Sequence, residues 1–255
     1  MRTPLIAANW KMHKTVAEAL DFVKVAEPHL AAIHKVEVVV CPPFTSLYPL
    51  SQRLQGSAIR LGAQDVFWEE RGAYTGEISP EMLQEAGSRY VIIGHSERRQ
   101  VLGETDTVIN KKVGNALGNQ LRPILCVGET LEERRAGLAR EVVQAQLKSD
   151  LKGIMVQGSD LVVAYEPVWA IGTGVNASPE DAQEMSAFIR EQLSQLLGNG
   201  AAGAARILYG GSVKQANIRD FVRQPDVDGA LVGGASLDAG SFITIVKYTE
   251  ETVHD

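Results

Sequence analysis

Short apolar runs alternate with longer amphipathic stretches along the whole chain, and this alternation limits the possible folds more than any other feature. Eight runs have the length of buried strands. They are Leu5–Trp10, Val36–Cys41, Ile59–Gln64, Tyr90–Gly94, Pro123–Val127, Leu161–Glu166, Ile207–Gly210 and Gly229–Val232. The clearest helical segments between them are Val16–Ile33, Thr107–Leu117, Arg140–Leu151 and Pro179–Leu197. Strands that alternate with helices favour a parallel sheet covered by helices.

The number of strands and the chain length select among the parallel-sheet folds. A (β/α)8 barrel typically needs about 250 residues, and this chain has 255. Size alone also allows two smaller domains, but no linker interrupts the alternation. We therefore expect an α/β protein with a single (β/α)8 barrel domain over residues 1–255, in which eight parallel strands are ringed by helices.

Charge and apolar content bear on partners and location. The net charge is -6, and no basic stripe with interleaved aromatics is present, which argues against nucleic acid. No apolar run approaches membrane-spanning length, and the N-terminal residues do not resemble a secretory signal. Cys41 and Cys126 each end an apolar run, as buried thiols in a reducing compartment do. We expect a cytoplasmic protein with no nucleic-acid and no membrane partner.

The segment after the sixth apolar run suggests chemistry. Glu166 stands where that run ends, and Pro167 biases it towards extended geometry. An apolar segment then closes on Gly172-Thr173-Gly174, as a hinged lid would. A carboxylate on a rigid strand beneath a water-excluding flap suits proton transfer.

Other polar side chains should join Glu166, because the carboxyl ends of the strands meet at one mouth of a parallel barrel. Asn9 and Lys11 end the first run and, two apart in an extended chain, should face the same side. His95 directly follows the fourth run, with Ser96 near the cap of a helix start. The N–H groups and dipole there disfavour an imidazolium, so we expect a neutral ring. Alone, Lys11 could extend to solvent and His95 could be a satisfied buried side chain.

Glycine-rich motifs follow strands six, seven and eight. They are Gly172-Thr173-Gly174, Gly210-Gly211-Ser212 and Gly233-Gly234. Glycine lets backbone N–H groups approach an anion closely, and the loops after strands seven and eight often bind phosphate in such barrels. The three motifs indicate a phosphorylated ligand.

No cofactor is expected. Residues 172–177 match a Gly-x-Gly-x-x-Ala dinucleotide fingerprint, but residues 167–171 separate the motif from its strand. That separation argues against a nicotinamide or flavin cofactor. The five histidines form neither an HExxH motif nor a close His/Cys pair, so no metal site is expected.

The longest apparent loop, Asp65–Ser79, carries Phe67, Trp68 and Tyr74 beside glycines. Exposed aromatics at a loop tip suggest docking onto another subunit. The alternative is a loop folded over its own barrel.

Five segments resemble the triosephosphate isomerase family, in order and spacing, across essentially the whole chain. They are Asn9–Met12, Tyr90–Arg99, Glu166–Gly174, Tyr209–Val213 and Leu231–Leu237. The resemblance implies a TIM barrel that interconverts dihydroxyacetone phosphate and D-glyceraldehyde 3-phosphate through an enediolate, in glycolysis and gluconeogenesis. It implies a small phosphorylated triose as substrate and neither cofactor nor metal.

The resemblance also implies a role for each matched catalytic residue. Glu166 would move the proton between two carbons, while His95 would polarise and protonate the substrate oxygens. Lys11 and Asn9 would contact the substrate and stabilise its developing negative charge. The backbone N–H groups that would hold the phosphate belong to Gly172, Ser212, Gly233 and Gly234.

Further residues would support the site in such enzymes. Glu97 would anchor Lys11, and Tyr209 would clamp the closed lid at Ala177. Ile171 and Leu231 would remove water from Glu166 and make it more basic. Thr75, in the loop 65–79, would reach into a second copy of the chain, which implies a homodimer.

Two other readings of the same residues remain open. A Schiff-base aldolase would use Lys11 as its nucleophile, although neither a second lysine nor an apolar pocket is indicated beside it. A non-catalytic sugar-phosphate-binding barrel would need the glycines but not the base.

Overall fold

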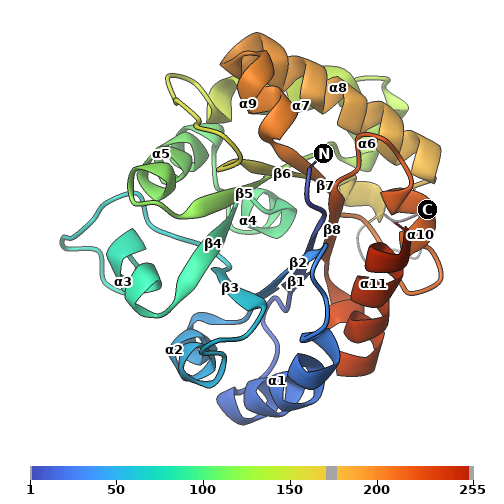
Figure 1. Cartoon of the computed structure of the whole chain (residues 1–255). Coiled ribbons are helices and arrows are strands. Elements are labelled where there is room, and N and C mark those ends of the chain that lie inside the picture. The colour runs from blue at the N-terminus through green and yellow to red at the C-terminus, as the bar shows by residue number, and fades with distance from the viewer. Residues whose placement is uncertain (1, 171–176, 253–255) are drawn as a thin grey trace.

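The computed structural model of the chain describes residues 2–170 and 177–252. Eight parallel strands pair in chain order and close into a barrel, and helices surround it (Figure 1). The strands are β1 (Leu5–Asn9), β2 (Glu37–Cys41), β3 (Ile59–Ala63), β4 (Ser88–Ile93), β5 (Arg122–Val127), β6 (Val162–Tyr165), β7 (Arg206–Tyr209) and β8 (Gly229–Val232). The expected fold class is confirmed.

The barrel closes where β1 pairs with β8, with Leu5 opposite Gly229. The backbone of Gly229 has a φ of +136°, and a Cβ atom there would lie 1.9 Å from the carbonyl oxygen of Leu5. This closure therefore requires glycine.

The helices outnumber the four clearest predicted segments because short helices also stand in the connections. They are α1 (Val16–Leu30), α2 (Phe44–Arg53), α3 (Pro80–Glu85), α4 (Ser96–Gln100), α5 (Asp106–Gly118), α6 (Leu131–Arg135), α7 (Ala139–Asp150), α8 (Pro179–Leu197), α9 (Asn199–Ala204), α10 (Ile218–Val222) and α11 (Ala239–Thr252), with 3₁₀ turns η1 (Val168–Ala170) and η2 (Gly234–Ser236). Thr15 and Ser178 cap α1 and α8 through capping boxes. In the described part of the chain, no helix is both long and apolar enough to cross a membrane.

Successive side chains of each strand face opposite sides of the barrel wall. The outward-facing ones pack under the helices. The inward-facing ones form a second cluster: Leu5, Ala7, Val39, Cys41, Tyr90, Ile92, Ile124, Cys126, Val162, Ala164, Leu208 and Leu231. Because this cluster fills the middle of the barrel, polar groups of the interior collect at its two ends.

Candidate active site

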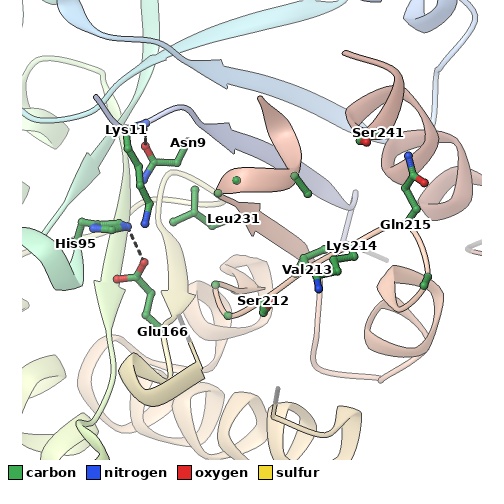
Figure 2. Close-up of a pocket in the computed structure, with 16 residues that line it drawn as sticks. Asn9, Lys11, His95, Glu166, Ser212, Val213, Lys214, Gln215, Leu231 and Ser241 are labelled. Atoms are coloured by element: carbon green, nitrogen blue, oxygen red, sulfur yellow. Dashed lines mark hydrogen bonds and ion pairs between the residues drawn. The ribbon is translucent and has the colours of Figure 1, made fainter. Parts of the chain in front are cut away.

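A cavity of about 650 Å³ opens at the carboxyl ends of the strands (Figure 2). Asn9, Lys11, His95 and Glu166 all lie in its wall, so the structure brings the four predicted polar groups together. The same wall includes Gly210, Gly211, Ser212, Leu231, Gly233 and Gly234. A volume of this size accommodates a small ligand.

Lys11 reaches the cavity through a left-handed backbone turn. β1 ends at Asn9, and the backbone of Lys11 has a φ of 52°. Residues other than glycine rarely adopt this conformation. The side chain of Asn9 accepts the N–H of Lys11 at 3.0 Å, and Nε2 of Gln64 donates to the Lys11 carbonyl at 2.8 Å. Asn9 and Lys11 both line the cavity, but the predicted reason, alternation along an extended strand, is wrong. Gln64 was not predicted.

His95 and Glu166 contact each other in the cavity wall (Figure 2). Nε2 of His95 lies 3.0 Å from Oε1 of Glu166. The N–H of Ser96 donates to Oε2 of the same carboxylate at 2.8 Å. His95 is 5% exposed and Glu166 is 2% exposed, so these contacts supply the polar partners that a buried carboxylate needs.

His95 is itself the N-cap of α4. Its Nδ1 accepts the N–H of Glu97 at 3.2 Å, so the proton of a neutral ring lies on Nε2 and points at Glu166. Ser96, which was expected near the cap, is the first residue of the helix. The start of α4 thus orients the imidazole and also binds the carboxylate.

The pKa of His95 is raised, although the helix start predicts a lowered one. Burial lowers this pKa, but the charge and hydrogen bond of Glu166, together with the charge of Glu97, raise it by more. Burial raises the pKa of Glu166, yet the facing imidazole and the Ser96 N–H lower it below its ordinary value. The predicted direction for His95 is wrong because the sequence did not place a carboxylate against Nε2.

Glu97 connects Lys11 to this pair. Nζ of Lys11 lies 2.6 Å from Oε1 of Glu97, and Oε2 of Glu97 lies 3.6 Å from Nδ1 of His95. The Lys11 and Glu97 side chains are 26% and 50% exposed, so solvent screens this ion pair. The contact positions the ammonium group over the cavity more than it stabilises the fold.

Two glycines make room for Glu166, and the sequence did not single out the first of them. A Cβ atom on Gly128 would lie 1.8 Å from the carbonyl oxygen of Glu166. One on Gly210 would lie 2.8 Å from Cγ of Glu166. Real Cβ atoms essentially never approach another atom this closely. The backbone of Glu166 beside Gly128, and its side chain beside Gly210, can therefore take their positions only because glycine has no Cβ atom.

The opposite wall of the cavity comes from β7, β8 and the segments that follow them. Ser212, Gly233 and Gly234 line it, and Leu231 lies beside them with 3% exposure. Tyr209 is fully buried beneath; burial raises its pKa to about 12, and the backbone of Ala177 acts in the opposite direction. Ile171, Gly172 and the rest of the predicted lid through residue 176 lie outside the described residues.

The segment that leads into the lid is fixed by a buried carboxylate that the sequence did not single out. Glu129 is fully buried. Its Oε1 accepts the hydroxyl of Tyr165 at 3.0 Å and Nε1 of Trp169 at 2.9 Å. Arg134 adds an ion pair to the same oxygen at 3.3 Å. The sequence around Glu129 gave no signal of this role, because Tyr165 and Trp169 are distant in sequence.

Residues 64–79 contain no helix or strand, as the predicted loop requires. Phe67 stacks on Trp68, with ring centroids 4.0 Å apart, and also contacts Tyr74 at 4.5 Å. Phe67 is 8% exposed, so its expected exposure is wrong: the ring is covered by its own loop. Tyr74 is 43% exposed, and the neighbouring Thr75 is exposed at the tip.

Residues 2–170 and 177–252 contain no group of three His, Cys, Asp or Glu side chains able to hold a metal ion. Cys41 and Cys126 are both buried and unpaired. Burial raises the pKa of Cys41 to about 12. These thiols are part of the barrel interior.

Comparison with known proteins gives one consistent result. The family model described as triosephosphate isomerase matches residues 4–249. A triosephosphate isomerase of Moorella thermoacetica is 59% identical over 98% of this chain and 100% of that protein. One of Carboxydothermus hydrogenoformans is 54% identical over 97% and 99%. The crystal structure of triosephosphate isomerase from Bartonella henselae superimposes with a TM-score of 0.88 at 39% identity, covering 96% of this chain and 98% of that one.

Proposed function

The chain belongs to the triosephosphate isomerase family, and from that premise we propose how its residues carry out the reaction. The protein is an isomerase that interconverts dihydroxyacetone phosphate and glyceraldehyde 3-phosphate in glycolysis. These two trioses differ in the position of one hydrogen on adjacent carbons and one on the attached oxygens. A single base on one side of the substrate can therefore serve both carbons.

Glu166 is the base in this proposal. Its carboxylate lies in the cavity wall, and its lowered pKa keeps it ionised near neutral pH, ready to accept a proton. It removes a hydrogen from one carbon and returns it to the other through an enediolate. Both of its oxygens are engaged by Ser96 and His95, so one of these contacts must be exchanged for the substrate.

His95 acts at the substrate oxygens. Because Nδ1 accepts the Glu97 N–H, the ring donates from Nε2, which faces the cavity. When Glu166 turns to the substrate, that donor is freed for the carbonyl oxygen. Lys11 and the amide of Asn9 lie across the same space (Figure 2) and stabilise the negative charge that develops.

The phosphate group is held at the opposite wall. Ser212, Gly233 and Gly234 support this role because they line the cavity and can present backbone N–H groups without large side chains. Gly172 completes the set on the basis of the family pattern. Leu231, with Ile171 from the lid, excludes water from Glu166 and protects the enediolate from loss of phosphate.

Nothing favours the Schiff-base aldolase or the non-catalytic barrel. Nζ of Lys11 is ion-paired with Glu97 at 2.6 Å, whereas an imine-forming lysine must be an uncharged amine. The observation that carries the isomerase mechanism is the 3.0 Å contact between His95 and Glu166 in a cavity that also holds Lys11.

The working unit is a homodimer in the cytoplasm. The exposed Tyr74 and Thr75 at the loop tip support pairing with a second copy of the chain, and Val101 and Leu102 expose further apolar surface at 77% and 63%. Sedimentation of the purified protein tests this: we expect the mass of two chains, and a Thr75→Arg variant that shifts towards one. A single-chain mass for the unaltered protein would contradict it.

A change of side-chain length tests the catalytic proposal. Glu166→Asp withdraws the carboxylate by one methylene, and a misplacement of that size costs about 10²-fold in turnover. The NADH-coupled assay on glyceraldehyde 3-phosphate should show this loss in kcat with little change in KM. Unchanged turnover would dismiss Glu166 as the base.

A further inference from the structure

The amino ends of the strands carry a second group of polar side chains, at the far end of the barrel from the active site. We call this group the barrel floor: Glu37, Arg60, Tyr90, Arg122 and Arg206. Tyr90 belongs to the inner cluster. Side chains two apart on a strand face the same way, and the residues two beyond Glu37, Arg122 and Arg206 are inner-cluster Val39, Ile124 and Leu208. Arg60 alternates with the outward-facing Ile59 and Leu61. All five therefore face the barrel axis.

The floor opens into a cavity of about 690 Å³ that is separate from the active site. Four arginines line it: Arg2, Arg60, Arg122 and Arg206. Within the described part of the chain, Glu37 is the single acidic side chain of the lining. A basic cavity of this kind contrasts with a chain whose net charge is -6.

Two of these arginines share the same partners. Arg206 contacts Glu37 at 2.5 Å and the hydroxyl of Tyr90 at 2.8 Å. Arg122 donates to the same hydroxyl at 3.2 Å and lies 4.0 Å from the other oxygen of Glu37. Two like charges thus gather around one carboxylate and one neutral oxygen.

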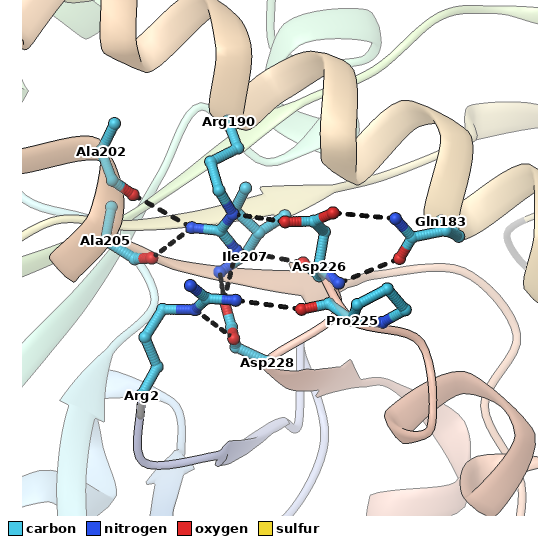
Figure 3. A network of polar contacts seen from close by, with 9 residues as sticks. All are labelled: Arg2, Gln183, Arg190, Ala202, Ala205, Ile207, Pro225, Asp226 and Asp228. Atoms are coloured by element: carbon cyan, nitrogen blue, oxygen red, sulfur yellow. Dashed lines mark hydrogen bonds and ion pairs between the residues drawn. The ribbon is translucent and has the colours of Figure 1, made fainter. Parts of the chain in front are cut away.

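Arg2 contributes little free charge to the cavity (Figure 3). It donates to Asp228 at 2.6 Å and to the carbonyl of Pro225 at 3.0 Å. Asp228 also accepts from Arg190 at 2.8 Å. The charge of Arg2 is therefore neutralised by Asp228, and its side chain forms part of the cavity wall. Any anion in the cavity would be bound by the other three arginines.

Those three have more donors than acceptors. Among the described residues, no carboxylate forms an ion pair with Arg60, which is exposed. Arg206 is 4% exposed, and no described group accepts from its buried Nε. Arg122 has a second carboxylate, Asp160, at 3.7 Å, but that side chain is 47% exposed. The Nε of Arg206 is closed off from the cavity, so the free donors there are those of Arg60, for which no acceptor is present among the described residues.

We propose that the barrel floor binds a compact anion that carries phosphate groups, with diphosphate as the simplest example. Guanidinium groups bind phosphate oxygens through paired hydrogen bonds, and the cavity is within the size range of small-ligand sites. Arg60 and Arg122 supply the exposed donors, and Arg206 holds Glu37 and Tyr90, the partners that it shares with Arg122. The site is independent of the isomerase chemistry.

Calorimetric titration with pyrophosphate tests the proposal. The active site is first saturated with glycerol 3-phosphate, which has the carbons and phosphate of the substrate but no carbonyl to react. We expect the unaltered protein to bind one pyrophosphate per chain under this condition. Arg60→Ala with Arg122→Ala should weaken that binding at least about tenfold, because it removes the charge-assisted donors. Glu37→Gln should tighten it, because a competing carboxylate is lost.

The matched control is Arg53→Ala with Arg223→Ala, which removes the same charge from helix surfaces outside the cavity. It should leave pyrophosphate binding within about twofold. Melting curves of all variants without ligand show whether each is folded. The proposal fails if the unaltered protein binds pyrophosphate only at the active site, so that the cavity variant keeps full affinity, or if the cavity variant and the control lose affinity equally.

Discussion

At the mouth of the barrel, Glu166 and His95 are 2% and 5% exposed and each has two polar partners. At the floor, Arg60 is exposed, and the side chain of Arg122 is 41% exposed. The catalytic pair at the mouth is therefore buried and held by partners before a substrate arrives, whereas these two arginines of the floor extend into solvent. Proton transfer requires the first arrangement, and binding of a small anion is compatible with the second.

The two ends also differ in how they treat negative charge. The mouth offers glycine-rich backbone and the side chains of Lys11 and Lys214 to a phosphate, and the carboxylates of Glu166 and Glu97 are occupied by Ser96, His95 and Lys11. The cationic groups of the floor are mainly the guanidinium groups of its arginines. A substitution at one end should thus affect turnover, and its counterpart at the other end should affect only stability or anion binding.

The largest expected contrast comes from changing one carboxylate to an amide at each end. Glu166→Gln removes the base and should lower kcat by about 10³-fold or more. Glu37→Gln breaks the ion pair with Arg206 and should cost about 2 kcal/mol of folding free energy while leaving kcat within about twofold. Steady-state kinetics and urea unfolding of both variants measure this. Similar kcat losses in the two would remove the distinction between the ends.

Adding one methyl group at each end sharpens the contrast. Gly128→Ala at the mouth places a Cβ atom 1.8 Å from the carbonyl oxygen of Glu166, and Gly229→Ala at the floor places one 1.9 Å from that of Leu5. Both should lower stability by about 2 kcal/mol or more. Gly128→Ala should also lower kcat about tenfold or more because it displaces the base.

The kcat of each glycine variant is taken per folded molecule, at a temperature where its circular dichroism matches that of the unaltered protein. Gly229→Ala should then have nearly normal turnover. A lower kcat for Gly229→Ala than for Gly128→Ala would reverse the expected order.

A smaller effect concerns the protonation of His95. Burial lowers its pKa, but the carboxylates of Glu166 and Glu97 together raise it by more, and Glu166 contributes the larger part. Glu166→Gln removes that charge, so the pKa of His95 should fall, and the imidazolium should appear only at lower pH than in the unaltered protein. Nitrogen NMR of the ring follows this titration. A pKa that stays the same or rises would show that Glu166 does not set it.

Much of the mouth could be predicted from the sequence, because strand ends and glycine motifs are local patterns. Glu166, His95 and Asn9 stood at the ends of apolar runs, and the motifs at Ser212 and Gly233 followed predicted strands. Side chains held by distant partners could not be found this way. Glu129 is defined by Tyr165 and Trp169, and no local pattern connects them.

The floor was not predicted for a specific reason. The predicted strands began at Pro123 and Ile207, one residue after Arg122 and Arg206. Neither arginine was therefore assigned to a strand. Only the strand register shows that these side chains face the axis. The exposure of Phe67 was misjudged for a related reason, because the ring is covered by neighbours in its own loop.

The central claim is that the Glu166 carboxylate carries the hydrogen between the two carbons of the triose. The most direct measurement is deuterium incorporation during isomerisation in D2O, followed by NMR of the product. The mechanism predicts that the unaltered protein places deuterium on the carbon that receives the proton, and that Glu166→Gln loses exchange and isomerisation in the same proportion. If the variant isomerised the substrate at the normal rate, or the two losses differed widely, Glu166 would not be the group that moves the proton.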